Sequence, residues 1–232
     1  MRKQPRIASV LKHKTRNPCA LIGAGIAVFC LMFVGSAHAG AQANEELSAS
    51  VRTSLQRAVS DRAVNKMAMA DGEEAQQWLM EMSKRLEKRL PSTQERLDLL
   101  KTVHYEASRA GLDPQLVLGV IEVESAFRKY AVSVVGAQGY MQVMPFWTRS
   151  IGVREHNLFH LRTNLRYGCT ILRHYLDIEK GDLYRALGRY NGSLGKPEYP
   201  NLVLAAWKGK WDLPVKTATV AKIIPTTIKI KQ

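Results

Sequence analysis

Cysteine is scarce in this sequence, and two of its three cysteines lie near the N-terminus. Cys19 and Cys30 fall within a leading apolar segment, so Cys169 is the one cysteine in the remaining chain. A single thiol cannot form a disulfide within the chain or supply a cysteine-based metal site. We therefore expect a fold that rests on an apolar core, with Cys169 as a small buried residue.

Acidic residues are missing from the first 39 positions, which carry six basic residues followed by an apolar run at 19–35. The run ends at Ser36-Ala37-His38-Ala39, whose small residues suit signal-peptidase cleavage after Ala39. We expect residues 1–39 to be a signal peptide and the protein to be exported to the periplasm or cell envelope. The apolar run is near the minimum length of a membrane span, so an uncleaved membrane anchor is the alternative.

The rest of the chain lacks a second apolar run of spanning length, and its histidines lack the spacing of a zinc protease. Without residues 1–39 it keeps 28 basic and 20 acidic residues, a formal charge of +8. Outside the cytoplasm such a protein meets polyanionic wall polymer or anionic lipid. The sequence also contains no recognisable nucleic-acid-binding motif, so we expect no nucleic-acid partner.

Helical patterns account for most of the chain after residue 72, so the fold class is predicted to be mainly α. Local signals mark several boundaries. Ser92 with Glu95 forms a capping box, and Asp113 with Pro114 is typical of a helix start. We expect helices at these segments: 73–90, 92–110, 113–125, 164–177, 182–190 and 201–211.

The segment from Phe127 to Val143 lacks a helical period and contains two glycines and several β-branched residues. This pattern predicts a loop with a short hairpin, positioned to fold back over the preceding helix. The predicted organisation is then a signal peptide, a helical extension, a helical domain and a basic tail without acids. Their bounds are 1–39, 40–91, 92–212 and 213–232.

Two carboxylates, Glu122 and Glu124, stand near the end of one predicted apolar helix. Residues two apart point to nearly opposite sides of a helix, so at most one of them serves a given site. Glu124 is the candidate, because apolar neighbours such as Ala126 and Phe127 disfavour its charged form and raise its pKa. From the spacing alone, a solvated glutamate or a salt-bridge partner is the more common outcome.

Several short motifs follow in order from Glu124 onward. Together they resemble the signature of the soluble lytic murein transglycosylases, the SLT family, over roughly residues 99–206. The residues that carry the resemblance are Glu124-Ser125-Ala126-Phe127, Ala131-Val132-Ser133, Gly136-Ala137-Gln138-Gly139-Tyr140-Met141-Gln142, Met144-Pro145, Asn164, Gly168 and Tyr190-Asn191.

This resemblance implies a lysozyme-like helical fold, with the loop segment over the cleft. It also implies cleavage of peptidoglycan glycan strands between N-acetylmuramic acid and N-acetylglucosamine, leaving a 1,6-anhydro sugar. Glu124 would act first as the acid and then as the base, while the N-acetyl carbonyl of the substrate stabilises the developing cation. A partner carboxylate, a metal and a cofactor are then not required.

The resemblance also implies roles for five further residues. Ser133 and Gln142 would hydrogen-bond the substrate or orient the glutamate, and Tyr190 would place its hydroxyl near the acetamido group. Met141 and Asn191 would line the cleft. The alternatives are core packing for Met141 and a loop hydrogen bond for Ser133 and Gln142.

The chain departs from the usual family pattern at a few positions. Tyr140 stands where Leu is usual, Val134 and Val135 lie near a usual Pro, and Arg189 stands where Ala is usual. The Glu-Ser and Met-Gln pairs are intact, so these departures bear on the preferred glycan length or peptide context.

Two other functions remain open from the sequence. A hydrolytic muramidase on the same fold would use an activated water instead of the C6 hydroxyl. A cell-wall-binding or secretion-apparatus component would keep the cleft and use its helical extension and basic tail to contact cell-envelope or secretion-system proteins. Because a binding module has no need of a buried acid, an intact Glu124 argues against a purely structural role.

Overall fold

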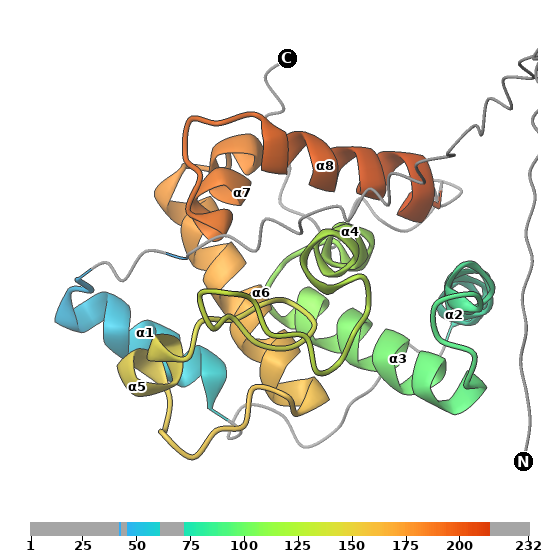
Figure 1. The fold of residues 1–232 in the computed structure, drawn as a ribbon, viewed down its shortest axis with the longest axis horizontal. Helices are drawn as coiled ribbons and strands as arrows, with labels where there is room; N and C mark the ends of the chain where they lie inside the picture. Colours follow the sequence, from blue (N-terminus) through green and yellow to red (C-terminus); the bar gives the residue numbers. More distant parts are fainter. Residues whose placement is uncertain (1–41, 43–45, 61–71, 214–232) are drawn as a thin grey trace, which may run out of the picture. The chain divides into compact units, whose positions relative to one another are not determined.

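A computed structural model describes residue 42 and residues 46–60 and 72–213 (Figure 1). The predicted signal peptide and the tail beyond Leu213 lie outside these described residues. The described residues are mainly helical, which confirms the predicted fold class. The helices are α1 (Ala49–Val59), α2 (Glu73–Leu86), α3 (Thr93–Arg109), α4 (Pro114–Ser125), α5 (Phe146–Ile151), α6 (Leu161–Ile178), α7 (Leu183–Asn191), α8 (Glu198–Ala206) and a π-helical turn, η2 (Trp207–Trp211).

Two helices begin at the caps that the sequence predicted. The Ser92 hydroxyl accepts a hydrogen bond from the Glu95 N–H at 3.3 Å ahead of α3. The Asp113 carboxylate accepts one from the Gln115 N–H at 2.8 Å, and Pro114 is the first residue of α4. Each cap satisfies a backbone N–H that has no partner within its helix.

The end of α2 differs from the prediction, because the helix stops at Leu86 instead of Leu90. The N–H groups of Arg89 and Leu90 both bond to the Leu86 carbonyl at 2.9 Å, which closes the last turn. The residue before a proline avoids the helical region, so Pro91 ends the helix earlier than its own position.

Two other helices start three residues earlier than predicted, and one short helix was not predicted. Helix α8 begins at Glu198, three residues before the predicted start, because Pro200 is tolerated in the first turn where its missing N–H is not needed. Helix α6 likewise begins at Leu161 instead of residue 164. The short helix α5 was not predicted; its N-cap residue, Pro145, makes no side-chain cap bond that would mark its start.

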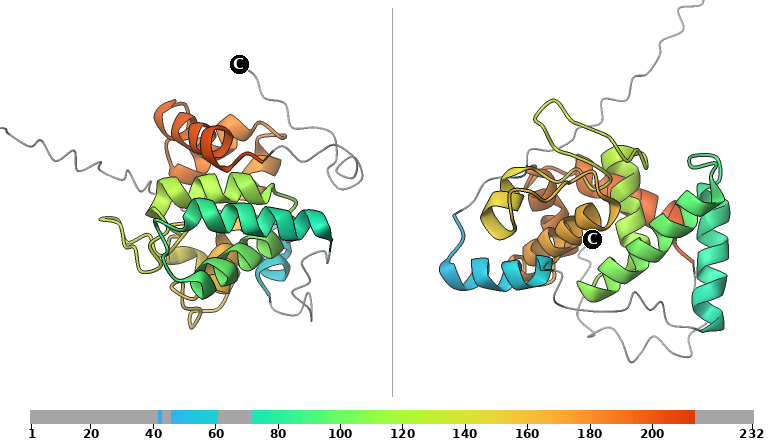
Figure 2. Two further views of the ribbon diagram at one scale, coloured as in Figure 1. Left: turned by 90° about the vertical axis from the view of Figure 1, so that its right-hand side faces the viewer. Right: turned by 90° about the horizontal axis from the view of Figure 1, so that it is seen from below.

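Helix α4 packs against α3 and α8, and it lies between them in both Figure 1 and Figure 2. At Gly119 the backbone of α4 lies close to the backbone at the junction of α8 and η2. A Cβ added there would lie 3.1 Å from the backbone nitrogen of Trp207 and 3.2 Å from the carbonyl oxygen of Val203. A side chain at this position would require α8 and η2 to shift away from α4, so glycine allows this close approach.

A buried ion pair joins α6 to α3. Glu106 of α3 accepts from Nη2 of Arg166 of α6 at 3.2 Å, and both side chains are almost fully buried. Arg166 also donates to the carbonyl of Val59, the last residue of α1, at 3.4 Å. Removing one partner of a buried charge pair is strongly destabilising, so this cluster holds three helices together.

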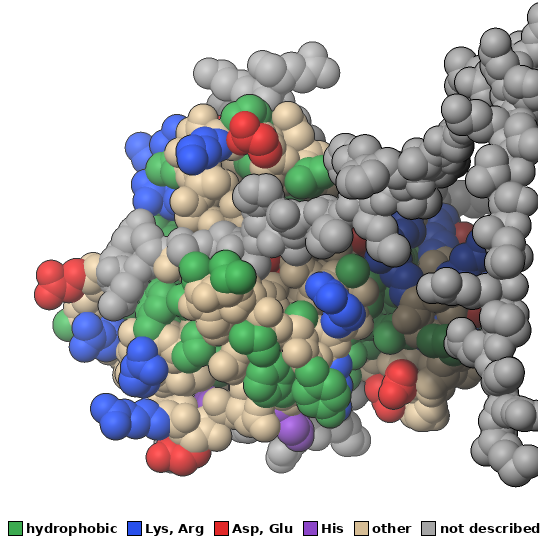
Figure 3. All heavy atoms as spheres, in the orientation of Figure 1, with side chains coloured by type: hydrophobic (Ala, Val, Ile, Leu, Met, Phe, Trp, Pro, Cys, Tyr) green, Lys and Arg blue, Asp and Glu red, His purple; other side chains and the backbone are tan. Residues whose placement is uncertain are grey.

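The segment between α4 and α5 has little regular structure. The predicted hairpin is reduced to two isolated antiparallel bridges, in which Gln138 pairs with Val132 and with Val143. The turns rely on Gly136 and Gly139, whose φ angles are +87° and +75°. Hydrophobic side chains lie at the surface over this loop (Figure 3); the exposed ones are Tyr130, Val132, Val134 and Val135.

Within the described ranges, every helix is too short or too polar to cross a bilayer. The apolar run at 19–35, predicted to belong to a signal peptide or an anchor, falls outside those ranges.

Candidate active site

The C-terminal end of α4 is fixed by a strained turn. Ala126 and Phe127, which follow the helix, have φ angles of 50° and 64°. This left-handed conformation is unfavourable for residues with a side chain. The Phe127 ring is buried and packs edge-on against Trp211, with ring centroids 5.3 Å apart. Burial of the ring offsets the strain, and the turn leaves Glu124 in the last turn of the helix.

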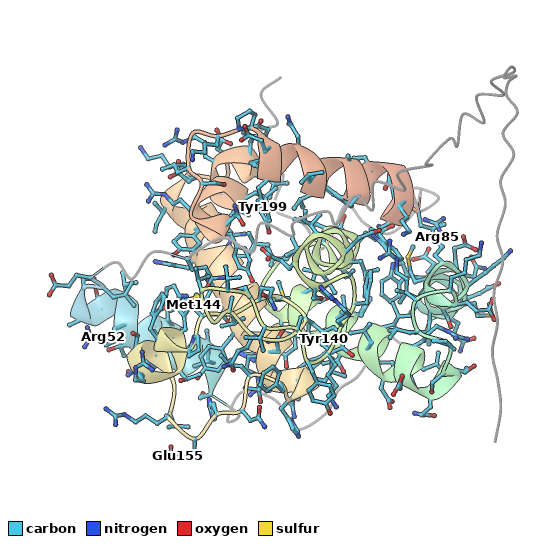
Figure 4. All side chains as sticks on the ribbon, in the orientation of Figure 1. Arg52, Arg85, Tyr140, Met144, Glu155 and Tyr199 are labelled. Carbon is cyan, nitrogen blue, oxygen red and sulfur yellow. The ribbon has the colours of Figure 1, made fainter. Side chains whose placement is uncertain are left out.

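Glu124 is a buried carboxyl group with one hydrogen-bond donor from another helix. Glu124 is only 5% exposed, and its Oε1 accepts a hydrogen bond from the Tyr199 hydroxyl at 2.6 Å. Figure 4 shows Tyr199 on the α8 side of the molecule. Burial raises the pKa of Glu124 to about 8, while the hydrogen bond from Tyr199 acts in the opposite direction. Glu124 is therefore mostly protonated at neutral pH and can donate a proton.

Glu122 is engaged elsewhere, as its position on the other side of α4 predicted. One carboxylate oxygen accepts from the Lys210 ammonium at 2.8 Å and from the Arg89 guanidinium, and the other accepts from Nε1 of Trp211 at 2.6 Å. These contacts tie α4 to η2 and to the turn that follows α2. Glu122 is thus a structural residue, and Glu124 stands apart from it.

Asn164 of α6 holds the loop between α4 and α5. Its Oδ1 accepts from the Met141 N–H at 2.8 Å, and its Nδ2 donates to the carbonyls of Gln138 and Leu158, both at 2.8 Å. Gly139 lies directly against this amide, since an added Cβ would be 2.4 Å from Nδ2. A fully buried asparagine thus fixes the backbone of the loop by two hydrogen bonds and ties it by a third to Leu158, between α5 and α6.

Ser133 and Gln142, two predicted binding residues, are used within the loop. The Ser133 hydroxyl accepts from the Ala137 N–H at 3.0 Å. The Gln142 amide donates to the carbonyls of Ala131 and Gly139, at 3.1 and 3.0 Å, and its backbone has a φ of 48°. Both side chains therefore hold the loop backbone.

Met141, Tyr190 and Asn191 are buried as well. The Met141 side chain packs against Gly168 of α6, where an added Cβ would lie 2.4 Å from its sulfur. The Tyr190 hydroxyl donates to the Met141 carbonyl at 2.7 Å. Burial first, and then the charge of Glu124, raise the pKa of Tyr190 well above its usual value, so this hydroxyl stays neutral and lies within the field of the carboxyl group.

Asn191 leaves one polar atom unsatisfied. Its Nδ2 donates to the Ser193 hydroxyl at 2.9 Å, but its buried Oδ1 has no hydrogen-bond partner among the described residues.

Tyr199 is the site residue that sequence reasoning missed. It lies close to the last predicted helix, but it is 75 positions from Glu124 and no local pattern links the two. Within the described part of the chain, Glu124 hydrogen-bonds to Tyr199 and to none of the five predicted binding residues.

Two hollows in the described surface lie away from Glu124. One of about 370 Å³ is lined by residues of α1, α3 and α6, including Glu106 and His174. The other, of about 420 Å³, lies beside α5 and includes Arg149, Arg154 and His156. We place the candidate site at Glu124, because Glu106, the buried carboxylate of the first hollow, is ion-paired with Arg166, whereas the buried Glu124 carboxyl group accepts from a neutral tyrosine hydroxyl. Among the described residues, no group of three or more His, Cys, Asp or Glu side chains is placed to hold a metal ion.

Comparison with known proteins gives matches over the same region. The family model described as "Transglycosylase SLT domain" matches residues 101–199. A "Transglycosylase" of Enterobacteria phage PRD1 is 35% identical over 99 residues, which are 43% of this chain and 36% of that protein.

A second group of relatives shares a shorter segment. A "Membrane-bound lytic murein transglycosylase C" of Actinobacillus pleuropneumoniae serotype 5b (strain L20) is 54% identical over 46 residues, which are 20% of this chain and 13% of that protein. The protein with the same description in Haemophilus influenzae (strain PittEE) is 44% identical over 46 residues, again 20% and 13% of the two chains. The matched segments thus span little more than a third of the phage protein and about an eighth of these two relatives.

Proposed function

We propose that the protein is a peptidoglycan lytic transglycosylase of the SLT family, because residues 101–199 match the family model of the transglycosylase SLT domain. The observation that carries the proposal is Glu124, a buried carboxyl group with a pKa raised to about 8 at the end of α4. A neutral carboxylic acid at physiological pH suits protonation of a glycosidic oxygen.

The proposed reaction needs one carboxyl group that acts twice. Glu124 gives its proton to the glycosidic oxygen as the bond to C1 of N-acetylmuramic acid breaks. The substrate's own acetamido oxygen bonds to C1 and carries the developing positive charge. The Glu124 carboxylate then removes the proton of the C6 hydroxyl, whose oxygen displaces the acetamido oxygen from C1. The products are a 1,6-anhydro-muramic end and a free C4 hydroxyl, without consumption of water.

The contacts of Glu122 support a mechanism with a single carboxyl group. Glycosidases that use two carboxylates place both beside the scissile bond. Glu122, the closest acid in sequence, is held by Lys210, Arg89 and Trp211 on another side of the helix. The Tyr199 hydroxyl gives Glu124 a fixed orientation and stabilises its charged form between the two proton transfers.

The roles of the other residues remain part of the proposal. Gln142, Met141 and Tyr190 would shape the cleft through the loop backbone that they hold, and Ser133 and Asn191 would contact the glycan. The relatives described as membrane-bound murein transglycosylases, together with the N-terminal sequence, support a place in the cell envelope. Peptidoglycan glycan strands are the proposed substrate.

The test is mass spectrometry of the fragments that the purified protein releases from peptidoglycan. We expect muropeptides with 1,6-anhydro ends, lighter by one water than reducing ends. Glu124→Gln should abolish release, because an amide cannot donate this proton, while its circular dichroism stays unchanged. Glu122→Gln is the matched control; it should keep the activity and lose only stability.

The other outcomes separate the remaining functions. Reducing-end products would identify a hydrolytic muramidase. No products from a folded wild-type protein would contradict both enzymatic functions and leave a wall-binding or secretion-apparatus role. Substantial activity in Glu124→Gln would remove Glu124 from the mechanism.

A further inference from the structure

Gln42 is a glutamine whose side-chain amide is buried and fully engaged. Only 4% of the residue is exposed. Its Oε1 accepts hydrogen bonds from Nε1 of Trp147 at 2.9 Å and from the Met144 N–H at 3.3 Å. Its Nε2 donates to the Gln142 carbonyl at 3.4 Å. Three groups of one short segment, residues 142–147, therefore converge on one amide.

These three groups form a preformed amide slot. The Gln142 backbone is held by its own side-chain bonds to Ala131 and Gly139, and Trp147 is buried in α5. Figure 4 places Met144 in the region between the loop and α5. The Gln142 acceptor and the Trp147 donor are thus held by contacts other than those with Gln42.

The slot lies beside the candidate catalytic group. Tyr190 hydrogen-bonds through its hydroxyl to Met141, the residue before Gln142. The same tyrosine interacts with the Gln42 amide and with the charge of Glu124. The Gln42 amide and the Glu124 carboxyl group are therefore both neighbours of one buried tyrosine.

The chemistry of the slot fits an N-acetyl group. The N–H groups of Met144 and Trp147 can donate to the oxygen of a bound amide, and the Gln142 carbonyl can accept from its N–H. The slot therefore pairs with any amide that offers one acceptor and one donor. Each amino sugar of peptidoglycan carries such an acetamido group. Gln42 presents the same two functional groups from the protein itself.

We propose that the slot formed by Gln142, Met144 and Trp147 binds an N-acetyl group of the glycan, and that Gln42 occupies it in the free protein as an internal competitor. The proposal rests on the proposed function of the Glu124 site. Gln42 would be the third residue of the chain after the predicted cleavage at Ala39, so the competing amide lies close to the new N-terminus.

Such competition lowers the apparent affinity for the glycan. The apparent dissociation constant rises as the fraction of molecules with an open slot falls, so an open fraction of about one tenth weakens binding about tenfold. Gln42→Ala removes the competitor and leaves the slot intact. It should tighten binding by about this factor.

The experiment measures binding of a tetramer of N-acetylglucosamine by calorimetry to the full chain carrying Glu124→Gln, so that no turnover occurs. Adding Gln42→Ala should lower the dissociation constant about tenfold. Gln94→Ala, which removes an exposed glutamine of α3 that bonds to Asp98, is the matched control and should leave the constant unchanged. A deacetylated glucosamine tetramer should bind equally with and without Gln42→Ala.

A second variant tests the slot itself. Trp147→Phe keeps an aromatic ring in α5 but deletes the Nε1 donor. In this background the tetramer should bind more weakly, and Gln42→Ala should tighten binding by much less than in the parent chain. Full tightening in this background would show that the two residues act separately and would overturn the slot.

Unchanged or weaker tetramer binding in Gln42→Ala would overturn the proposal and make Gln42 a structural residue. This result is distinguishable from failure of the proposed function, because binding is measured without catalysis. A wild-type protein that fails to cleave peptidoglycan contradicts only the enzymatic function. Tightening in Gln42→Ala would still establish the amide slot in that case.

Discussion

At the scale of single residues, the burial of Glu124 makes the stability of the protein depend on pH. The folded protein keeps the proton up to a pKa of about 8, while the unfolded chain loses it near the ordinary value of 4.5. Between these values the folded state binds more protons than the unfolded state. The contribution of Glu124 to the free energy of unfolding therefore falls as pH rises through this window and is constant above it.

Glu124→Gln should remove this dependence, because the amide does not titrate. Thermal melts of the wild type and the variant between pH 5 and 8.5 provide the measurement. We expect the variant to gain stability relative to the wild type as pH rises, by several kcal/mol across the window. A difference in melting temperature that stays constant over this range would contradict a raised pKa at Glu124.

The Tyr199 hydroxyl should tune the same group in the opposite direction. Its hydrogen bond lowers the pKa of Glu124, so Tyr199→Phe should raise that pKa further. The alkaline limb of the pH profile of kcat/KM should move to higher pH, and kcat should fall about tenfold as the carboxyl group loses its fixed orientation.

Tyr184→Phe is the matched control for Tyr199→Phe. Its hydroxyl contacts Asn201 near the surface at 3.1 Å, so its loss should leave the profile in place. An unshifted profile in Tyr199→Phe would show that the hydroxyl does not act on Glu124.

The sequence predicted Glu124 but could not predict its partner. The apolar neighbours of Glu124 are local in sequence and indicated a raised pKa, but the spacing alone favoured a solvated or ion-paired glutamate, and only the packed fold shows the burial. The contact with Tyr199 depends on the packing of α8 against α4, and the contact of Gln42 with Trp147 joins residues 105 positions apart. Neither contact leaves a pattern in a single sequence.

At the scale of elements, α6 determines the conformation of the loop through Asn164. Asn164→Ala removes three buried hydrogen bonds and leaves one N–H and two carbonyls of the loop and its neighbours without that partner. Unsatisfied buried groups cost about 1–3 kcal/mol each, so we expect a loss of about 3 kcal/mol or more in the free energy of unfolding by urea. Cleavage should fall as well, since the loop carries Gln142.

Asn201→Ala is the control for this substitution, because Asn201 is exposed on α8. Its effect should stay within about 0.5 kcal/mol. A loss below about 1 kcal/mol in Asn164→Ala would mean that the loop keeps its conformation without α6.

The starts of α3 and α4, each marked by a capping side chain, were predicted to within one residue, whereas the starts of α6 and α8, which lack a side-chain cap, were missed by three residues. Ser92 and Asp113 cap N–H groups two or three residues away, so the local sequence is enough to predict where these helices start. The loop predicted at Phe127–Val143 was also correct in outline, but its pairing is reduced to two bridges, and Asn164, which lies far away in sequence, holds it at Gln138 and Met141.

At the scale of the whole molecule, the site is assembled from segments that lie far apart in the sequence. Glu124 comes from α4, Tyr199 from α8 and Tyr190 from α7, while the loop between α4 and α5 carries the predicted binding residues Ser133, Met141 and Gln142. The family match at residues 101–199 covers all of these positions. Gln42 lies outside the match, so its contact with the loop is a feature of this chain beyond the matched region.

The close backbone contact at Gly119 links the packing of the core to the geometry of the candidate site. Because Gly119 has no side chain, α4 packs directly against the backbone at Val203 and Trp207. These two residues belong to the segment that follows Tyr199, so the contact sets the spacing between α4 and α8. A side chain at Gly119 would push α8 and η2 away from α4, and would therefore change the distance between the Tyr199 hydroxyl and Glu124 as well as the packing of the core.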